Sequence, residues 1–160
     1  MINELVRSFE STVKFVERSV ADLTDDELVQ QPPGVPNHGM WTVGHLVTSC
    51  QGMAEVLGVE PWLPGDWEAT FGYGSTPSPD RSRYRPKAEM LAMLADGARR
   101  LREAMLATDE TTLRKPWPDE AYPTLADILL QVVAGHTAYH AGQLAVWRRA
   151  IGKPSAGVFI

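Results

Sequence analysis

The sequence predicts an all-α protein, a four-helix bundle with long connections, formed by a single domain over residues 1–160. Apolar residues recur at three- and four-residue spacing in four long segments, and strand-like alternation is nearly absent. Pro and Gly fill the stretches between these segments. The content of 44% hydrophobic and 22% charged residues is typical of a globular domain that buries a core. We expect the helices over residues 2–20, 39–57, 86–107 and 124–151.

The first and third helices each carry one apolar stripe. Thr24 to Glu27 then forms a capping box that opens a short helical turn, and Pro86 stands at the start of the third helix. The two stripes consist of Leu5, Phe9, Val13, Val16 and Val20, and of Met90, Leu94, Leu101 and Met105.

The second and fourth helices are bounded by recognisable signals. Asn37 is a candidate cap for the second helix. Gly152 and Pro154 end the fourth helix, with Arg148 and Arg149 near its negative end. Strand-like alternation is limited to the tail, residues 157–160.

The long connection over residues 58–86 is rich in Pro and Gly and carries several aromatic residues. A loop of this length is uncommon in a compact domain unless it serves a function. We expect Trp62, Trp67 and Tyr73 either to pack as ordinary core or to form a wall of a pocket.

Charge and cysteine content exclude several classes of protein. Fifteen basic and 20 acidic residues give a formal charge of −5, which argues against nucleic-acid binding. The single cysteine, Cys50, permits neither an internal disulfide nor a thiolate metal cage. The N-terminal segment does not resemble a signal peptide, and no apolar run has the ~18–20 residues of a membrane span. We therefore expect a cytoplasmic protein with no membrane partner.

His136 and His140 are four residues apart in the fourth predicted helix. This spacing places the rings about 40° apart on one face and about 6 Å apart along the axis. Two imidazoles so placed can bind one metal ion, as in the H-E-x-x-H zinc motif, although Thr137 replaces the Glu of that motif. Both rings are expected in the middle of the apolar stripe, where an unpaired polar group costs several kcal/mol by a rough scale.

His45 can supply a third ligand from the buried face of the second helix. Ser49 and Gly52 follow it on the same face and are small, which leaves space beside the ring. Three neutral nitrogens without a fourth protein ligand are typical of a catalytic metal site. Because ligation requires neutral imidazoles, metal affinity is expected to fall below roughly neutral pH.

The other candidate ligands are rejected. His38 would lie about 10 Å from His45 along the helix axis and is expected at the helix entrance. Cys50 lies about 140° around the helix from His45 and is interpreted as a small buried hydrophobe. Trp41 and Gln143 share the histidine faces and are weaker candidates for contact with the substrate or with the ligands. Ordinary packing is an equally good interpretation of Gln143.

Three segments resemble the DinB-like (YfiT-like) metal-dependent superfamily. They are Asn37 to Leu46, Phe71 to Gly74, and His136-Thr137-Ala138-Tyr139-His140-Ala141-Gly142-Gln143-Leu144. The resemblance covers nearly the whole chain. It implies that His45, His136 and His140 bind nickel, zinc or a similar divalent ion, and that the protein forms a homodimer. It also implies an S-transferase that uses a low-molecular-weight thiol, an isomerase or a hydrolase.

The leading hypothesis is a metal-dependent S-transferase or hydrolase that acts on a small molecule. No carboxylate lies on the histidine faces, and Glu55 is expected to point away from them, so no general base is identifiable. This favours thiol transfer, because a metal-bound thiolate needs no base for its attack. The alternative is a non-catalytic bundle in which the metal is structural or absent.

Overall fold

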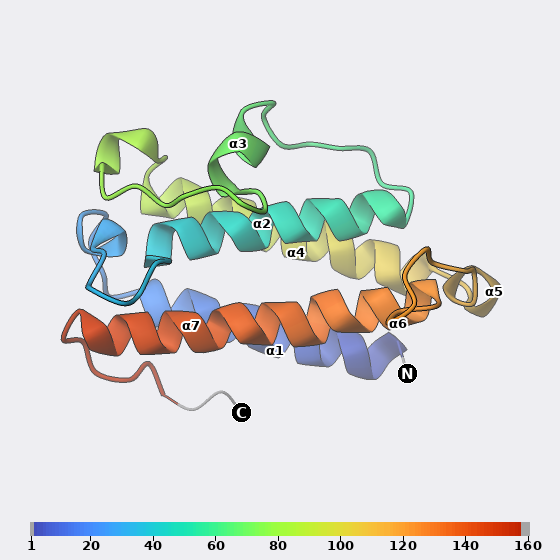
Figure 1. Cartoon of the computed structure of the whole chain (residues 1–160). Helices are drawn as coiled ribbons and strands as arrows, with labels where there is room; N and C mark the ends of the chain where they lie inside the picture. Colours follow the sequence, from blue (N-terminus) through green and yellow to red (C-terminus); the bar gives the residue numbers. More distant parts are fainter. Residues whose placement is uncertain (1, 158–160) are drawn as a thin grey trace.

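The computed structural model of the chain describes residues 2–157 and confirms the all-α architecture. Four long helices run side by side: α1 (Ile2–Val20), α2 (Gly39–Val56), α4 (Lys87–Ala107) and a composite last helix that ends in α7 (Thr137–Ala150) (Figure 1). The described residues form no β-strand, apart from an isolated bridge between Pro116 and Thr124. The predicted bounds of the first three helices are correct to within about one residue. Three residues of the tail, 158–160, lie outside the described part.

The last helix is not the uniform α-helix that the sequence predicts. It consists of α6 (Leu125–Leu130), a π-helical segment η3 (Gln131–His136) and α7. In η3 the N–H of Thr137 donates to the carbonyl of Val132, five residues earlier. The wider turn changes the rotation per residue, so side chains on either side of η3 do not follow a single 100° pattern. Such π segments occur frequently at functional sites.

The connections contain four short elements that position the long helices. They are the 3-10 turns η1 (Glu27–Val29) and η2 (Arg81–Arg83) and the short helices α3 (Trp67–Phe71) and α5 (Glu110–Leu113). Thr24 and Glu27 exchange hydrogen bonds, as the predicted capping box requires. Figure 1 shows α3 and the long connection that carries it lying over α2.

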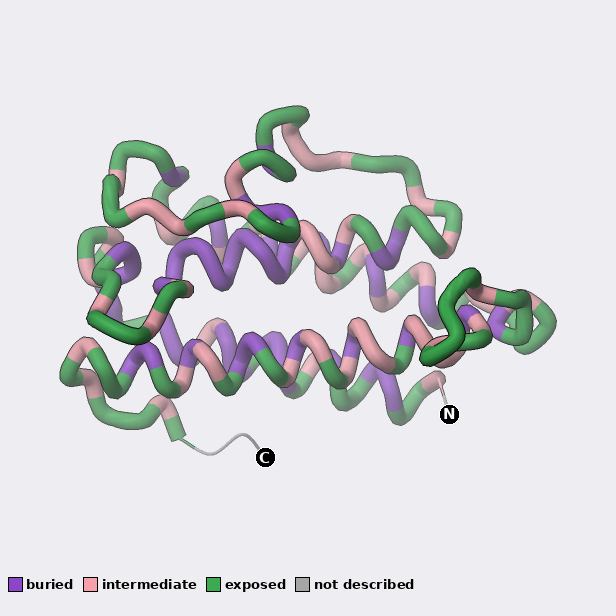
Figure 2. The backbone as a smooth tube through the Cα atoms, in the orientation of Figure 1, coloured by how far each residue is buried: buried purple, intermediate pink, exposed green. Residues whose placement is uncertain are grey.

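The buried faces of the four long helices meet in one core (Figure 2). All nine stripe residues that the sequence assigns to α1 and α4 are buried, and so are Trp67, Phe71 and Tyr84 from the long connection. Among residues 2–157, no helix combines the length and the hydrophobicity needed to cross a membrane.

The cap of α2 differs from the prediction. His38, not Asn37, occupies the cap position, and its Nδ1 accepts a hydrogen bond of 3.2 Å from the N–H of Trp41. Its Nε2 lies 2.9 Å from the carbonyl of Ser78 and donates to it, because a carbonyl only accepts. His38 is thus neutral and fully satisfied at the helix entrance, where the sequence predicts it.

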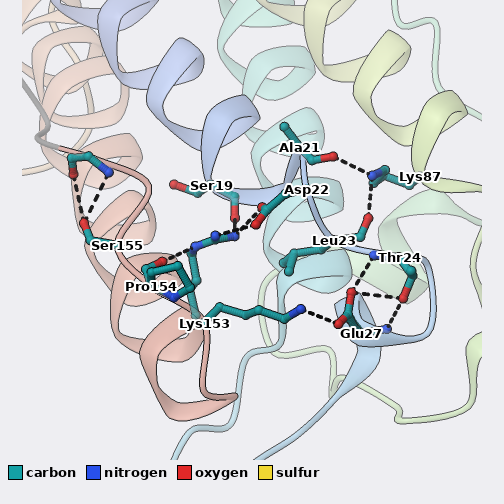
Figure 3. Close-up of polar contacts among 12 residues, drawn as sticks. Ser19, Ala21, Asp22, Leu23, Thr24, Glu27, Lys87, Lys153, Pro154 and Ser155 are labelled. Atoms are coloured by element: carbon teal, nitrogen blue, oxygen red, sulfur yellow. Dashed lines mark hydrogen bonds and ion pairs between the residues drawn. The ribbon is translucent and has the colours of Figure 1, made fainter.

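A polar cluster ties the last helix to α1 at the end of the bundle where α7 stops. Arg148, 4% exposed, donates from Nη1 to the carbonyl of Ser19 at 2.9 Å and from Nε to the carbonyl of Pro154 at 2.6 Å. Its two terminal nitrogens also bind both carboxylate oxygens of Asp22, at 2.6 and 2.7 Å. Figure 3 shows this region, in which Lys153 also pairs with Glu27. The sequence indicates Arg148 only as a charge near a helix end and does not reveal its burial.

Candidate metal centre

Two neighbouring helices bring three histidines together. His45 comes from α2, His136 is the last residue of η3, and His140 lies one turn further along α7. The Nε2 atom of His136 lies 3.2 Å from that of His45 and 3.1 Å from that of His140. One ring nitrogen of each residue lies within 4.8 Å of the others. The group can therefore hold one metal ion.

These separations fit the geometry of a shared ion. Two nitrogens bound at ~2.1 Å to one ion lie roughly 3.0–3.4 Å apart in octahedral or tetrahedral coordination. The nitrogen–nitrogen distances of 3.2 Å (His45–His136) and 3.1 Å (His136–His140) lie in that interval. Hydrogen bonding alone satisfies the cluster poorly, because the single Nε2 position of His136 cannot both donate to and accept from its two neighbours.

The His45 ring is held by its surroundings. Its Nδ1 lies 2.7 Å from the carbonyl of Phe71, so Nδ1 carries the proton and Nε2 keeps a lone pair when the ring is neutral. Trp41 stacks on the ring at 4.7 Å with an angle of 9° between the planes. A carbonyl that fixes the tautomer and orientation of a histidine is the usual support of a ligating imidazole.

The short helix α3 supplies that carbonyl, and α2 holds α3 in place. The indole of Trp67 donates to the carbonyl of Gly44 at 3.3 Å, and the indole of Trp41 donates to the carbonyl of Thr70 at 3.1 Å. The ring of Phe71 fills the space beside Gly44, where an added Cβ would come within 2.2 Å of it. Gly44 is therefore required for α3 to approach α2 closely enough to reach His45.

Burial keeps the three imidazoles neutral. Desolvation is the main cause that lowers the pKa of His136 to about 4, and the nearby His45 ring contributes to the same shift. Desolvation is also the main cause that lowers the pKa of His140 to about 4, with the His136 and His45 rings adding to it and Gln143 opposing it. The pKa of His45 is lowered by desolvation too, although the Phe71 carbonyl and the charge of Glu68 act against the shift. Neutral rings are the form that binds a metal.

His136 occupies a different position from the one that the sequence predicts. The expectation that both histidines lie in the middle of the apolar stripe holds for His140, 6% exposed, and is wrong for His136, which is half-buried. Because η3 widens the helix, the buried line on this side runs through Leu129, Val133 and Thr137. His136 lies beside this line and faces a cavity.

That cavity has a volume of about 490 Å³ and is bordered by His45 and His136. Ser49 and Gly52, the small residues that the sequence places beside His45, form part of its wall. The rest of the wall comes from α2 (Thr48, Gln51, Met53, Glu55 and Val56), from the long connection (Glu68 and Tyr73), and from Trp117, Ile128 and Val132. The histidine cluster is therefore accessible from one side.

Two carboxylates border this cavity, although the sequence places none on the histidine faces of the helices. Glu68, on α3, is near enough to His45 for its charge to raise the pKa of that ring. Glu55 also borders the cavity, although helical arithmetic places it far around α2 from His45. The sequence offers no signal for Glu68, because its position depends on how the long connection folds back over α2.

The weaker candidates have defined contacts. Trp41 is buried and touches the cluster directly through its stack on His45. Gln143 is half-buried, donates to the Tyr139 hydroxyl at 2.8 Å and accepts from the Asn37 amide at 3.4 Å. A role for Trp41 or Gln143 toward a metal or substrate stays a prediction.

The aromatic residues of the long connection have separate roles. Tyr73 borders the cavity, whereas Trp67 is buried against Phe71 at a ring distance of 4.6 Å. Trp62 packs under the guanidinium of Arg100, which lies 5.0 Å from the ring centre. Of the three aromatic residues considered for a pocket wall, Tyr73 alone lines this one.

Cys50 is excluded from the cluster. The side chain is buried, and desolvation raises the pKa of its thiol to about 12. A thiol with so high a pKa is neither a nucleophile nor a metal ligand at neutral pH. The interpretation of Cys50 as a small buried hydrophobe therefore agrees with its surroundings.

The fold and the cluster define a class of protein: a helical bundle in which one histidine of the second long helix meets a histidine pair of the last. The chain belongs to the DinB superfamily, whose family model matches residues 8–144. A conserved protein from Enterococcus faecalis has a similar structure, with a TM-score of 0.79 and 18% sequence identity. The alignment covers 96% of this chain and 98% of that protein, and it establishes the fold alone. A comparison with curated proteins finds no match.

Proposed function

We propose that this protein is a metal-dependent enzyme for a small-molecule substrate, with His45, His136 and His140 as the ligands of one divalent ion such as nickel or zinc. The observation that supports this best is the set of three imidazole nitrogens at ligating distances beside a cavity of about 490 Å³. An imidazole donor set suits zinc, nickel, copper or iron. Three protein ligands leave coordination positions for a substrate, as catalytic sites require.

When bound, such an ion acts as a Lewis acid and lowers the pKa of a thiol or a water molecule beside it. The protein's own residues supply orientation and a partly dry environment. The Phe71 carbonyl fixes the tautomer of His45, and Trp41 keeps that ring from turning. Burial holds the imidazoles neutral and able to ligate at pH 7.

Thiol transfer is the leading reaction. A cavity of about 490 Å³ falls within the usual range for small-molecule sites, roughly 300–1,000 Å³. It has space for a low-molecular-weight thiol beside an electrophile. The thiolate sulfur forms a bond to the electrophilic carbon, the leaving group departs with its electron pair, and the thiol proton passes to solvent. No protein base is required for the attack.

Hydrolysis is a second candidate, and one observation favours it. Glu68 and Glu55 line the same cavity as His45 and His136. A carboxylate in this position can accept the proton of an attacking water molecule, the role of a general base. Glu68 and Glu55 are therefore candidates for the general base that the sequence alone leaves unidentified.

Two experiments test the proposal. Metal analysis of the purified protein is expected to give about one divalent ion per chain. The metal-loaded protein is then incubated with a chromogenic electrophile, with and without low-molecular-weight thiols. Turnover that requires the thiol supports transfer, whereas turnover that is unaffected by the thiol supports hydrolysis. A protein that binds no divalent ion contradicts the whole proposal.

The non-catalytic alternative predicts a different response to chelation. A structural ion holds the fold together, so its removal would unfold the bundle. A catalytic ion at the edge of an existing core leaves the fold intact when it is removed. The core of this bundle extends over all four long helices and does not depend on the histidines. We therefore expect a modest change in melting temperature on chelation.

A further inference from the structure

We propose that the cavity beside the three histidines selects small molecules that carry a positive charge, so that the thiol or substrate bound there bears an ammonium group. This inference rests on the proposed function, because it takes the cavity to be the substrate site. Three features of the cavity wall support it: two carboxylates without an ion pair, the absence of lysine and arginine among the described lining residues, and two aromatic side chains.

The two carboxylates come from separate elements and lie on the same cavity. Glu55 is on α2 and Glu68 is on α3. Neither forms an ion pair with any residue in the described range, 2–157. Some surface carboxylates of this protein are paired with arginines, as Asp96 is with both Arg99 and Arg100. The charges of Glu55 and Glu68 have no such compensation.

No lysine or arginine lines the cavity among the residues that the structure describes. An anionic ligand would therefore meet two like charges at Glu55 and Glu68, and an ion held by the histidines would be the cation that acts against them. Sites that recognise carboxylates or phosphates usually provide arginine or lysine. The wall of this cavity has neither of these side chains among the described residues and carries two carboxylates instead.

Aromatic side chains complete a surface suited to an organic cation. Tyr73, 100% exposed, and the partly buried Trp117 both border the cavity. Aromatic rings attract ammonium groups because their faces carry partial negative charge. Val56, Ile128 and Val132 add apolar surface for the carbon skeleton of the ligand. A small amine with a short apolar chain satisfies all these groups together.

Glu68 and two of the histidines border the same cavity, and the volume of that cavity limits the size of the ligand. It is about 490 Å³. A ligand that contacts both Glu68 and an ion at the histidines is therefore a small molecule with an ammonium group and a sulfur or oxygen donor. Aminothiols and amino-alcohol derivatives have this arrangement.

The test compares three thiols of similar size: cysteamine (cationic), 2-mercaptoethanol (neutral) and 3-mercaptopropionate (anionic). Their binding to the metal-loaded protein is measured by calorimetry at low salt. Because the bound ion attracts the carboxylate of 3-mercaptopropionate in every variant, the quantity compared is the ratio of the cysteamine affinity to the 3-mercaptopropionate affinity. We expect this ratio to be about 10-fold lower in Glu55→Gln/Glu68→Gln than in the unsubstituted protein. A ratio that is unchanged by this double substitution, or that rises, overturns the inference.

Glu60→Gln is the matched control. Glu60 is an exposed acidic residue near Glu55 in the sequence that does not line the cavity, so this variant changes the net charge without changing the wall. It should keep the full preference for cysteamine. If Glu60→Gln reduces the preference as much as Glu55→Gln/Glu68→Gln does, the selectivity reflects the overall charge of the protein and the inference is wrong.

A second pair of probes separates this inference from the proposed function. Benzyltrimethylammonium and benzenesulfonate are titrated into the metal-free protein, with tryptophan fluorescence as the signal. The inference is supported if the protein binds the ammonium compound and the Glu55→Gln/Glu68→Gln variant does not, even if the protein binds no metal. If the protein binds one metal ion per chain but shows no charge preference in either titration, the proposed function stands and the inference is wrong.

Discussion

The bundle contains two groups of buried polar side chains that differ in how their hydrogen-bonding capacity is used. The arginine cluster consists of Arg148, Asp22 and the carbonyls of Ser19 and Pro154, and the histidine cluster consists of His45, His136 and His140. In the arginine cluster, three nitrogens of Arg148 each donate to an oxygen at 2.6–2.9 Å. In the histidine cluster, the Nδ1 atoms of His136 and His140 are buried and have no partner among the described residues. Their Nε2 atoms face one another.

Whether the polar atoms of a cluster are all paired distinguishes a cluster that stabilises the fold from one that is suited to bind a ligand. A buried polar network with every member paired fixes one arrangement of its helices. The neighbouring imidazole nitrogens of the histidine cluster have too few N–H donors to pair with one another, so a cation bound between them would stabilise them. The arginine cluster lies far along α7 from the cavity, and the histidine cluster lies on its edge. The four predictions below test whether the two clusters behave in these different ways.

The largest expected effect follows from removing one ligand. His140→Ala should lower the affinity for Zn²⁺ or Ni²⁺ by ~1,000-fold or more, because loss of a ligand exceeds the 10–100-fold that loss of a supporting hydrogen bond costs. Calorimetric titration of the metal-free protein measures it. Circular dichroism should show unchanged helical content, since His140 carries no backbone role. His38→Asn, which alters a histidine outside the cluster while keeping a cap acceptor, should bind metal normally. Normal metal binding by His140→Ala would refute the assignment.

The second prediction concerns pH. Burial lowers the folded-state pKa of His136 and His140 to about 4, below the unfolded value of about 6.5. Between these values the unfolded chain binds more protons, so the stability of the metal-free protein falls as the pH decreases from about 6.5 to 4. A shift of this size corresponds to about 3 kcal/mol for each histidine, so we expect a loss of up to about 6 kcal/mol, measured by urea denaturation at several pH values.

The same shift modifies the pH dependence of metal binding that the sequence predicts. Protons compete for folded imidazoles only near pH 4, so affinity should stay high at pH 6 and decline below it. The arginine cluster titrates in a lower window, because the guanidinium of Arg148 lowers the pKa of Asp22 to about 2. Its contribution is present above about pH 4 and is lost as the pH approaches 2. A stability curve that is flat from pH 7 to 4 would contradict the burial of the histidines.

The third prediction perturbs the arginine cluster. Arg148→Met should lower the free energy of unfolding by about 2 kcal/mol, because it leaves the Ser19 carbonyl without this donor and Asp22 without its partner. The expected loss is moderated by the exposure of Asp22, which is 55% at its side chain. Denaturant titration measures the loss. Metal affinity should be unchanged, and a coincident loss of metal binding would show that the two clusters are not independent.

Much of this molecule follows from residue spacing, and what does not follow depends on long-range packing. The apolar residues of α1 and α4 recur every three to four positions, the period of a regular α-helix, so their burial could be predicted. The register around His136 could not, because a π turn adds a residue without any local signal in Gln131 to Gly135. Glu68 reaches the histidines through the docking of α3, which depends on Phe71 filling the space at Gly44. The burial of Arg148 likewise depends on a partner, Asp22, that is distant in the sequence.

The smallest expected effect tests the docking of α3. Gly44→Ala places a methyl group within 2.2–2.6 Å of the Phe71 ring and should displace α3, so that the Phe71 carbonyl no longer holds His45. We expect metal affinity to fall by ~10-fold, the usual cost of a lost supporting hydrogen bond to a ligating histidine. Gly142→Ala is the control. Gly142 lies in α7 with no atom within 4 Å of an added Cβ, so this change should leave affinity unchanged and stabilise the helix by about 0.5–1 kcal/mol. Calorimetry on both variants decides the matter, because equal affinities would mean that α3 does not orient His45.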